Sequence, residues 1–427
     1  MNTSQTRRTF VKRTTVFSFG LAAAPLALRA QTRRSPGEKL VVGVMGLGRG
    51  FDHVRALQQI ANVEIAYLAD IDDERIARAQ KSAFANADKP PKAVKDFRRV
   101  LEDKDVDALF IAAPNHWHAP ATILACAAGK HVYVEKPGSH NAREGELMVA
   151  AARKHQRVVQ MGNQRRSYPG IIEAVEKLRA GAIGEVRVAR TWYNNARTTI
   201  GRGQAVPVPA NLDYSLWQGP APERPYVDNL VHYNWHWRWH WGGGELANNG
   251  PHALDLARWG LGVEVPTRIT CNGGRYHFSD DQETPDTAIA TYDFGGKAIV
   301  WDGSSCHPRN GENLGFVNWY GDNGSLVALD RGYKIFDPKG KQVGEGSGPG
   351  GDKVHIENFL KTIRGEAKPN SEIAVGQTSV LLCHLGNIAY RTGHTLDIDP
   401  KTGRILNDKT AMNLWKRDYR KGWEPKV

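Results

Sequence analysis

The fold is decided by KLVVGVM at residues 39–45, followed by GLGRGFDHVRALQQI at 46–60 and NVEIAYLADID at 62–72. The first run is apolar and β-branched, and it has the length of a buried parallel strand. The second run is a glycine-rich turn that leads into a helix, and the third is another strand, which ends at Asp70. Strand, turn, helix and strand make a βαβ unit, so we expect the chain to begin its fold with a parallel sheet.

The same alternation continues toward residue 160. Helices are expected near residues 73–85 and 96–101, a strand at DALFIAAP (107–114), and a helix from Pro120 that stops at Gly129 and Lys130. A further strand follows at HVYVEKP, residues 131–137. The pattern predicts an α/β fold, with a doubly wound parallel sheet of the Rossmann type over residues 38–160.

Residues 161–427 differ in composition from residues 38–160: they contain more tryptophan and glycine, and longer loops are expected. Alternating runs such as EVRVARTWY (185–193), TAIATYDF (287–294) and AIVWDGSS (298–305) are typical of antiparallel strands. The glycine-rich stretch 340–351 is expected to be a loop. This part is therefore predicted to be an α+β domain with a large, mostly antiparallel open sheet, which binds substrate and joins subunits into a homodimer or homotetramer.

The positive charge of the chain is concentrated at its start. The net charge is +12, and residues 1–35 carry seven Lys and Arg residues without any Asp or Glu, which leaves +5 for the rest. That remainder is spread thinly, with Arg165 and Arg166 as the nearest thing to a patch, so a nucleic-acid partner is not expected.

The first 35 residues are interpreted as a twin-arginine signal peptide and linker. Arg7 and Arg8 precede an uncharged stretch, residues 14–28, that is too short and too interrupted to span a bilayer. We expect export to the periplasm through the twin-arginine machinery, with a membrane tether if the signal is not cleaved. Ala30 is the candidate cleavage site, although it is a poor one because Leu28 stands where a small residue is preferred.

The glycine turn and Asp70 together predict a dinucleotide site. Gly46, Gly48 and Gly50 lie between strand and helix, where the backbone can approach a pyrophosphate at the helix N-terminus. Asp70 follows about twenty residues later, where a carboxylate binds the adenosine ribose hydroxyls. Because this charge repels a 2′-phosphate, NAD is favoured over NADP, although Arg49 in the turn and Arg75 leave NADP open.

Two polar segments follow neighbouring strands, APNHWHAP at 113–120 and the EKP of residues 135–137. Ligands bind at the carboxyl ends of strands in an open α/β sheet, so both segments are expected at the cofactor site. Lys136 would lie beside an oxidised nicotinamide, whose positive charge, together with burial, should lower the pKa of its ammonium group.

In these residues the chain resembles the Gfo/Idh/MocA oxidoreductases, which are named for glucose-fructose oxidoreductase and inositol dehydrogenase. The resemblance covers nearly the whole chain after the leader. It rests on the glycine turn, Asp70, PNHWH, AGKHVYVEKP (128–137) and GGGELANNGPHALD (242–255).

The resemblance implies roles for particular residues. Lys136 and His252 are catalytic: the lysine holds the reacting hydroxyl and the histidine acts as the general acid and base. Asp255 follows His252 on the same helical face, whereas Asn248 stands where inositol dehydrogenases carry aspartate, so no carboxylate partner for the histidine is assured. The residues expected to bind cofactor are Gly46, Gly48, Arg49, Gly50, Asp70, Pro114, Asn115, His118, Glu135 and Lys136.

The stretch HYNWHWRWHW at 232–241 alternates tryptophan with polar residues. Aromatic faces suit the C–H faces of sugar rings, so a carbohydrate or polyol substrate is predicted, although tryptophans buried in the core or at a subunit interface fit equally. The alternation also predicts extended structure. The residues expected to bind substrate are Gln164, Arg165, Tyr193, Trp235, His236, Asn248 and His252.

Three other readings compete with a simple dehydrogenase. An NAD-dependent glycosidase or epimerase would oxidise a sugar hydroxyl transiently and regenerate its cofactor within each cycle. A zinc hydrolase would use His232, His236 and His240, but extended structure would scatter these imidazoles, and no metal site is predicted. A sugar-binding protein with an inactive nucleotide domain is disfavoured by the presence of Lys136 and His252.

Overall fold

The computed structural model describes residues 37–307, 309, 311–312 and 315–427. The predicted twin-arginine leader lies outside these residues. Within the described part of the chain, every helix is too short or too polar to cross a membrane.

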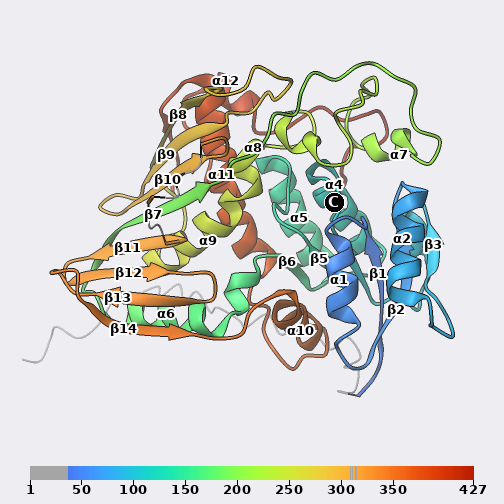
Figure 1. The fold of residues 1–427 in the computed structure, drawn as a ribbon, viewed down its shortest axis with the longest axis horizontal. Coiled ribbons are helices and arrows are strands. Elements are labelled where there is room, and N and C mark those ends of the chain that lie inside the picture. Colours follow the sequence, from blue (N-terminus) through green and yellow to red (C-terminus); the bar gives the residue numbers. More distant parts are fainter. Residues whose placement is uncertain (1–36, 308, 310, 313–314) are drawn as a thin grey trace, which may run out of the picture. The chain divides into compact units, whose positions relative to one another are not determined.

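The first sheet is parallel, and its six strands run in the order β3-β2-β1-β4-β5-β6 (Figure 1). The order reverses between β1 and β4, which creates the crevice where open α/β sheets bind ligands. The Rossmann prediction is therefore confirmed. The strands are β1 (Leu40–Met45), β2 (Val63–Ala69), β3 (Lys92–Val94), β4 (Ala108–Ile111), β5 (His131–Val134) and β6 (Val159–Met161).

The first three helices between these strands agree with the predictions, the fourth starts earlier than predicted, and the fifth was not predicted. They are α1 (Gly50–Leu57), α2 (Asp73–Phe84), α3 (Arg98–Glu102), α4 (Asn115–Ala127) and α5 (Ala142–Lys154). The prediction that α4 starts at Pro120 is wrong by one and a half turns. Proline removes one backbone hydrogen bond, but nearly every residue of α4 is buried, and this packing keeps the helix intact. The NHWH motif consequently forms the first turn of α4.

A helix from near the end of the chain contributes to the core of the first domain. Helix α10 (Asp352–Ile363) inserts Ile356, Phe359 and Leu360 into the same apolar core as Leu40 of β1. The ring of Phe359 packs edge-on against Phe110, with centroids 5.6 Å apart. The division of the chain at residue 160 stays a prediction, but this helix shows that the first core draws on residues from both sides of it.

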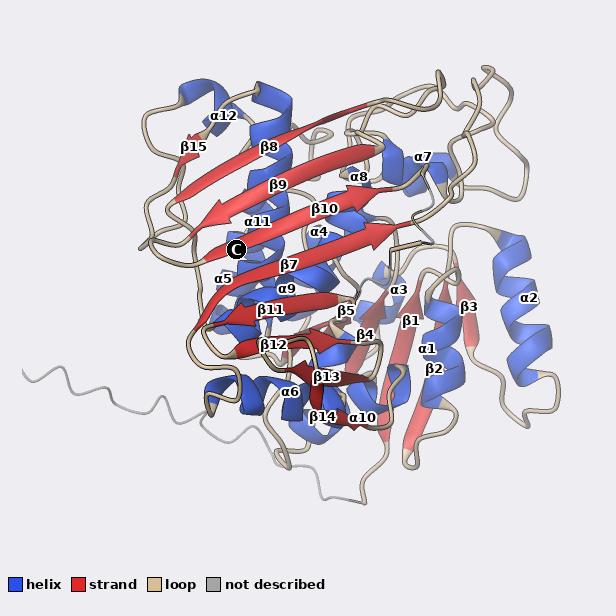
Figure 2. Cartoon of the chain, turned by 60° about the vertical axis from the view of Figure 1, so that its left-hand side comes forward, coloured by secondary structure: helices blue, strands red, loops and turns tan. Residues whose placement is uncertain are grey.

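The second sheet has nine strands in the order β14-β13-β12-β11-β7-β10-β9-β8-β15, and Figure 2 shows them side by side. All neighbours pair antiparallel except β7 and β10. The prediction of a mostly antiparallel second sheet is confirmed. Its strands are β7 (Val186–Asn194), β8 (Arg268–Gly274), β9 (Thr287–Asp293), β10 (Ala298–Ser304), β11 (Val317–Gly321), β12 (Gly324–Ala328), β13 (Gly332–Phe336), β14 (Gln342–Ser347) and β15 (Leu396–Asp397).

Three helices pack on one face of this sheet: α6 (Pro169–Arg179), α9 (Gly250–Leu261) and α11 (Ile373–Thr392). Strand β9 alternates buried and exposed residues, and Ile289 on its outer side is half exposed. The remaining helical segments are η1 (Gln164–Ser167), α7 (Tyr214–Gln218), η2 (Asn234–Trp237), α8 (Gly244–Asn248) and α12 (Lys409–Asn413).

Two local predictions are wrong. The glycine-rich stretch 340–351 contains strand β14 instead of being loop throughout, because its backbone pairs with β13. The stretch 232–241 is a series of turns around η2, without extended structure. Its Trp235 and Trp241 turn into a small core with Leu212 and Trp217, and this packing overrides the alternation of residue types.

Candidate active site

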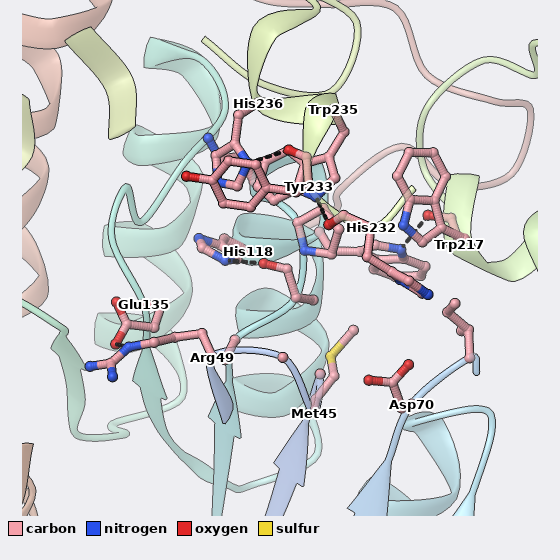
Figure 3. Close-up of a pocket in the computed structure, with 18 of the residues that line it drawn as sticks. Met45, Arg49, Asp70, His118, Glu135, Trp217, His232, Tyr233, Trp235 and His236 are labelled. Atoms are coloured by element: carbon pink, nitrogen blue, oxygen red, sulfur yellow. Dashed lines mark hydrogen bonds and ion pairs between the residues drawn. The ribbon is translucent and has the colours of Figure 1, made fainter. Parts of the chain in front are cut away.

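A cavity of about 620 Å³ lies at the carboxyl ends of β1, β2, β4 and β5. Its opposite side is formed by η2, α8 and the first turn of α9. In Figure 3, residues from the strand ends, such as Met45 and Asp70, lie below His118, and Tyr233, Trp235 and His236 lie above it. The cavity therefore has a nucleotide wall, made by the strand ends and the loops that follow them, and an opposite wall, made by residues after 193.

The glycine turn after β1 can exist only with glycine at its first position. Gly46 has φ +84°, and a Cβ atom there would lie 2.6 Å from the carbonyl oxygen of Ala112. A Cβ on Gly48 would meet the Arg75 guanidinium at 2.5 Å. Gly50 does not border the cavity. It begins α1 close to Val44, the tight helix–strand contact that the third glycine of a dinucleotide fingerprint provides.

Asp70 joins the end of β2 to the glycine turn. Its carboxylate accepts hydrogen bonds from the backbone N–H groups of Leu47, at 2.6 Å, and Asp72, at 3.1 Å. Burial raises the pKa of Asp70, although these bonds and the nearby Arg75 act in the opposite direction. The residue borders the cavity as predicted.

The same end of the cavity contains residues that the sequence did not single out as a group. They include Arg75, Lys95 and His232. His232 Nε2 lies 2.8 Å from a carboxylate oxygen of Asp72, so the segment after residue 193 is linked to the end of β2. No sequence signal would have placed His232 here, because its position depends on turns that the tryptophan packing sets.

Glu135 is the centre of a buried polar cluster. Its Oε1 accepts hydrogen bonds from Arg49 Nε and Gln164 Nε2, both at 3.1 Å, and lies 2.9 Å from His53 Nε2. Burial opposes ionisation, but Arg49 and His53 outweigh it and hold the pKa of Glu135 well below its usual value. Arg49 also pairs with Asp352 at the start of α10. This cluster fixes the segment that carries Lys136.

Lys136 reaches across the cavity to α8. Its Nζ donates to the carbonyl oxygen of Asn248 at 2.9 Å and to Asn248 Oδ1 at 3.0 Å. Burial lowers the pKa of the ammonium group, while Glu135 acts to raise it. An ammonium group has three N–H donors, so two are used and one remains for a ligand.

His252 lies in the first turn of α9 and borders the same cavity. Among the described residues, its imidazole has no hydrogen-bond partner. Burial and the charge of Lys136 lower its pKa well below 6.5, so the ring is neutral near pH 7. Asp255 does not orient it, because the Asp255 carboxylate accepts from Arg166 Nε at 2.7 Å and Ser379 Oγ at 2.6 Å.

His118 ties the two strand-end segments together. Its Nδ1 lies 2.6 Å from the carbonyl oxygen of Pro137, and its Nε2 lies 2.6 Å from that of Ala113. Burial lowers its pKa. His118, Pro114 and Asn115 all border the cavity, and they form the segment between β4 and the first turn of α4.

The opposite wall is aromatic and is crossed by one arginine. The rings of Trp235 and His236 stack with centroids 3.6 Å apart, and burial lowers the pKa of His236 to about 3. Arg197 Nη1 donates to Tyr233 Oη at 3.0 Å, and Arg197 Nε donates to the Glu245 carboxylate. Trp235 and His236 were predicted here, whereas Arg197, Tyr233 and Trp217 were not.

Two predicted substrate residues lie outside the cavity lining. Arg165 Nη2 pairs with Asp330 at 2.8 Å, and its guanidinium stacks over Phe316. The Tyr193 hydroxyl accepts from Arg197 Nη2 at 2.7 Å, so it supports a residue of the wall without bordering the cavity itself. Gln164, Asn248 and His252, by contrast, do border it.

The histidines that would form a zinc site face three different partners. His232 contacts Asp72, His236 Nδ1 lies 2.6 Å from the carbonyl oxygen of Tyr233, and His240 Nε2 lies 2.7 Å from that of Pro222. Within the described ranges, no three potential ligands converge on one point.

Two family profiles match this chain over most of its length. Residues 40–163 match the oxidoreductase family with NAD-binding Rossmann fold, and residues 186–425 match the C-terminal α/β domain of the same family, GFO_IDH_MocA. The second match alone covers more than half of the 427 residues.

Curated relatives agree with this family. The oxidoreductase YrbE of Bacillus subtilis is 25% identical over 76% of this chain and 79% of its own length. Inositol 2-dehydrogenase of Salmonella typhimurium is 30% identical over 37% of this chain and 47% of its own. Glycosyl hydrolase family 109 protein 1 of Shewanella sp. strain MR-4 is 29% identical over 44% and 45%. The chain thus spans about half the length of the latter two relatives.

Solved structures share the fold. The WlbA dehydrogenase of Chromobactrium violaceum, solved with NADH and UDP-GlcNAcA, has a TM-score of 0.67 at 18% identity, covering 86% of this chain and 97% of that one. Aldose-aldose oxidoreductase of Caulobacter crescentus has a TM-score of 0.65 at 20% identity, covering 84% and 100%.

Proposed function

Because this chain belongs to the Gfo/Idh/MocA family of NAD-binding oxidoreductases, we propose that it oxidises or reduces a hydroxyl-bearing carbon of a sugar, glycoside or polyol. The observation that carries the proposal is that Lys136, which follows β5, and His252, in the first turn of α9, border one cavity that begins at Asp70. This arrangement also disfavours a mere sugar-binding role, for which neither group is needed.

The residues of the nucleotide wall fit a dinucleotide. Gly46 has no side chain, so the backbone there can approach a pyrophosphate. The Asp70 carboxylate lies at the end of β2, where Rossmann folds bind the ribose hydroxyls. NAD supplies the site that gains or loses hydride when it is bound. Asp70 favours NAD over NADP, while Arg75 and Lys95 at the same end would tolerate an additional phosphate.

In the oxidation direction, Lys136 and His252 have different roles at the substrate hydroxyl. The third N–H of the Lys136 ammonium donates to the hydroxyl oxygen and stabilises negative charge that develops there. The neutral His252 ring accepts the hydroxyl proton, since its lone pair is not occupied by a partner within the described chain. In the reduction direction the same ring returns the proton.

The opposite wall supports a ring-shaped polyol or sugar as the substrate. Trp235, Trp217 and Tyr233 provide aromatic surface, and Arg197, Asn248 and Asn249 provide polar groups for hydroxyls. Inositol 2-dehydrogenase, among the relatives, acts on a cyclic polyol by its name.

The test begins with mass spectrometry of freshly purified, denatured protein to detect co-purified NAD or NADP. A panel of sugars and polyols is then added to the holoenzyme, and absorbance at 340 nm records reduction of the bound cofactor. We expect NAD to be released and at least one panel member to reduce it. Cofactor-free protein that also fails to bind added NAD or NADP would refute the proposal.

A second candidate is an NAD-dependent glycoside hydrolase or epimerase, favoured by the glycosyl hydrolase family 109 relative. Such an enzyme would use the same Lys136 and His252 but restore its cofactor in each cycle. Aryl glycosides incubated without added NAD distinguish the two functions. Multiple turnovers of phenol release favour a hydrolase that recycles its cofactor internally, whereas reduction of the bound NAD without phenol release favours a dehydrogenase.

We further propose export and self-association. The twin-arginine sequence of the leader supports passage of the folded enzyme to the periplasm, and cell fractionation tests it. The outer face of the nine-stranded sheet, with exposed Ile289 and Tyr320, supports a homodimer or homotetramer. Light scattering after size exclusion measures the assembly, and a monomer would contradict the proposal.

A further inference from the structure

A second cavity, which we call the basic cavity, lies beside the candidate active site. It has a volume of about 570 Å³ and is bordered by residues just before α5, by segment 222–224, by segment 239–243, by α11 and by residues 413–418. Asn115, at the start of α4, borders both cavities. The basic cavity plays no part in the hydride-transfer chemistry derived above.

Positive charge dominates its border. Arg224, Arg391, Lys416 and Arg417 line it, against the two acids Glu223 and Asp418. Glu223 pairs with Arg420 at 2.7 Å, and two of the cations have carboxylate partners outside the cavity border, Arg224 with Glu283 at 4.0 Å and Arg417 with Glu144 at 2.8 Å. Arg391 and Lys416 are exposed, and neither makes an ion pair with a carboxylate of the described chain. Unpaired cations around one concave surface attract an anion and repel a cation.

Deeper in the basic cavity, two buried donors lack acceptors. Arg417 uses Nε for Glu144 Oε1, at 2.8 Å, and Nη2 for the His116 carbonyl oxygen, at 2.7 Å, which leaves its buried Nη1 without a partner. Asn141 is 6% exposed. Its Oδ1 accepts from Glu144 N and caps α5, whereas its Nδ2 has no acceptor. Buried donors without acceptors are costly, so an acceptor that a bound oxygen-rich ligand brought to this side of the cavity would stabilise both residues.

The cavity also offers an aromatic surface. Trp239 borders it and is half-buried, and the Arg391 guanidinium carbon lies 5.0 Å from its ring centroid. An aromatic face beside guanidinium groups suits a ligand that has both C–H surface and negative charge. Inorganic anions alone would leave this surface unused.

We propose that the basic cavity binds an anionic sugar, with its carboxylate or phosphate near Arg391, Lys416 and Arg417 and its ring against Trp239. The site is separate from the proposed dehydrogenase chemistry. It would bind its ligand equally in a chain that had lost hydride transfer.

Isothermal titration calorimetry on the full chain saturated with NAD tests this proposal. The probes are D-glucuronate, D-glucose 6-phosphate, inorganic phosphate and D-glucose. We expect one or both anionic sugars to bind at least tenfold more tightly than glucose and inorganic phosphate, and the stronger of the two identifies the acidic group. The double variant Arg391→Gln/Lys416→Gln should weaken that binding at least tenfold.

The matched control is Arg268→Gln/Lys361→Gln, which removes two exposed cations that do not border the basic cavity and should leave binding unchanged. Lys136→Met should also leave it unchanged, which separates this site from the active site. Equal binding of glucose, equal binding of inorganic phosphate, or unaltered binding in the double variant would overturn the proposal. Thermal melts establish that each variant is folded.

Discussion

The two walls of the active-site cavity are built in different ways. The nucleotide wall consists of strand ends and the turns directly after them, and local sequence determines each turn: Gly46 by its positive φ, Asp70 by its place at the end of β2. The opposite wall consists mostly of irregular chain between β7 and α9, which is positioned by packing among Trp217, Trp235 and Trp241. A regular wall can hold a constant cofactor, whereas an irregular wall can be remodelled for different substrates without disturbing the sheet.

Lys136→Met should produce the largest effect, because it removes the ammonium group that donates from the nucleotide wall to Asn248 on the opposite wall. We expect kcat to fall roughly 10³-fold with NAD binding nearly unchanged, the size typical of losing an oxyanion-binding group. Stopped-flow reduction of bound NAD measures it. Lys154→Met, on the exposed end of α5, is the control, and a loss below tenfold in Lys136→Met would remove the lysine from the mechanism.

His252→Asn should lower kcat about 10²-fold, since the general base belongs to the opposite wall and its loss leaves the Lys136 site intact. Turnover and cofactor affinity are measured together. The exposed His277→Asn serves as the reference. If NAD affinity falls as much as kcat, the division of labour between the two walls is wrong.

Asp70→Asn should weaken NAD binding about 10- to 100-fold, which corresponds to the free energy of a hydrogen bond to a charged group. It should also raise the ratio of NADP affinity to NAD affinity. The substrate KM should not change, because the residue belongs to the nucleotide wall. Fluorescence titration with each cofactor tests this, against the exposed Asp105→Asn. Unaltered preference for NAD would mean that other residues discriminate the ribose.

The pH dependence of substrate oxidation follows from the direction of the His252 shift. An imidazole with a pKa of 6.5 would be only about one-tenth neutral at pH 5.5. Burial and Lys136 lower the pKa of His252, so its basic form persists as the pH falls, and kcat at saturating NAD should stay near its plateau at pH 5.5. A tenfold decline between pH 7.5 and 5.5 would contradict this.

Trp235→Phe should have the smallest effect, a rise in substrate KM of about threefold with unchanged kcat and NAD affinity, because part of one stacking surface is lost. Steady-state kinetics measures it, and Trp259→Phe, outside the cavity, is the control. A change in NAD affinity instead would show that the aromatic wall also binds cofactor.

The nucleotide wall was largely predictable from sequence. The turn at Gly46, the acid at Asp70 and the EKP lysine each follow a recognisable strand, and strand ends meet at one edge of a parallel sheet. The error at α4 arose because Pro120 looks like a helix start when burial is not known.

The opposite wall was predictable only in part. Trp235 and His236 were identified by residue type, but their extended conformation was not observed, and Arg197 and His232 were missed. Their positions depend on contacts between residues far apart in sequence, such as His232 with Asp72. No local pattern encodes such contacts.

Helix α10 has a consequence for how the protein is made. During synthesis, Phe110 of β4 and Tyr133 of β5 leave the ribosome roughly 230 to 250 residues before Phe359, the α10 side chain that packs against both rings. Until then the sheet presents an uncovered apolar stripe, so the first domain cannot mature on its own ahead of the rest. A fragment ending at residue 160 should therefore be aggregation-prone, and the natural unit for expression extends at least through α11, whose Ile373 and Val380 also enter the apolar core around Met45 and Leu109.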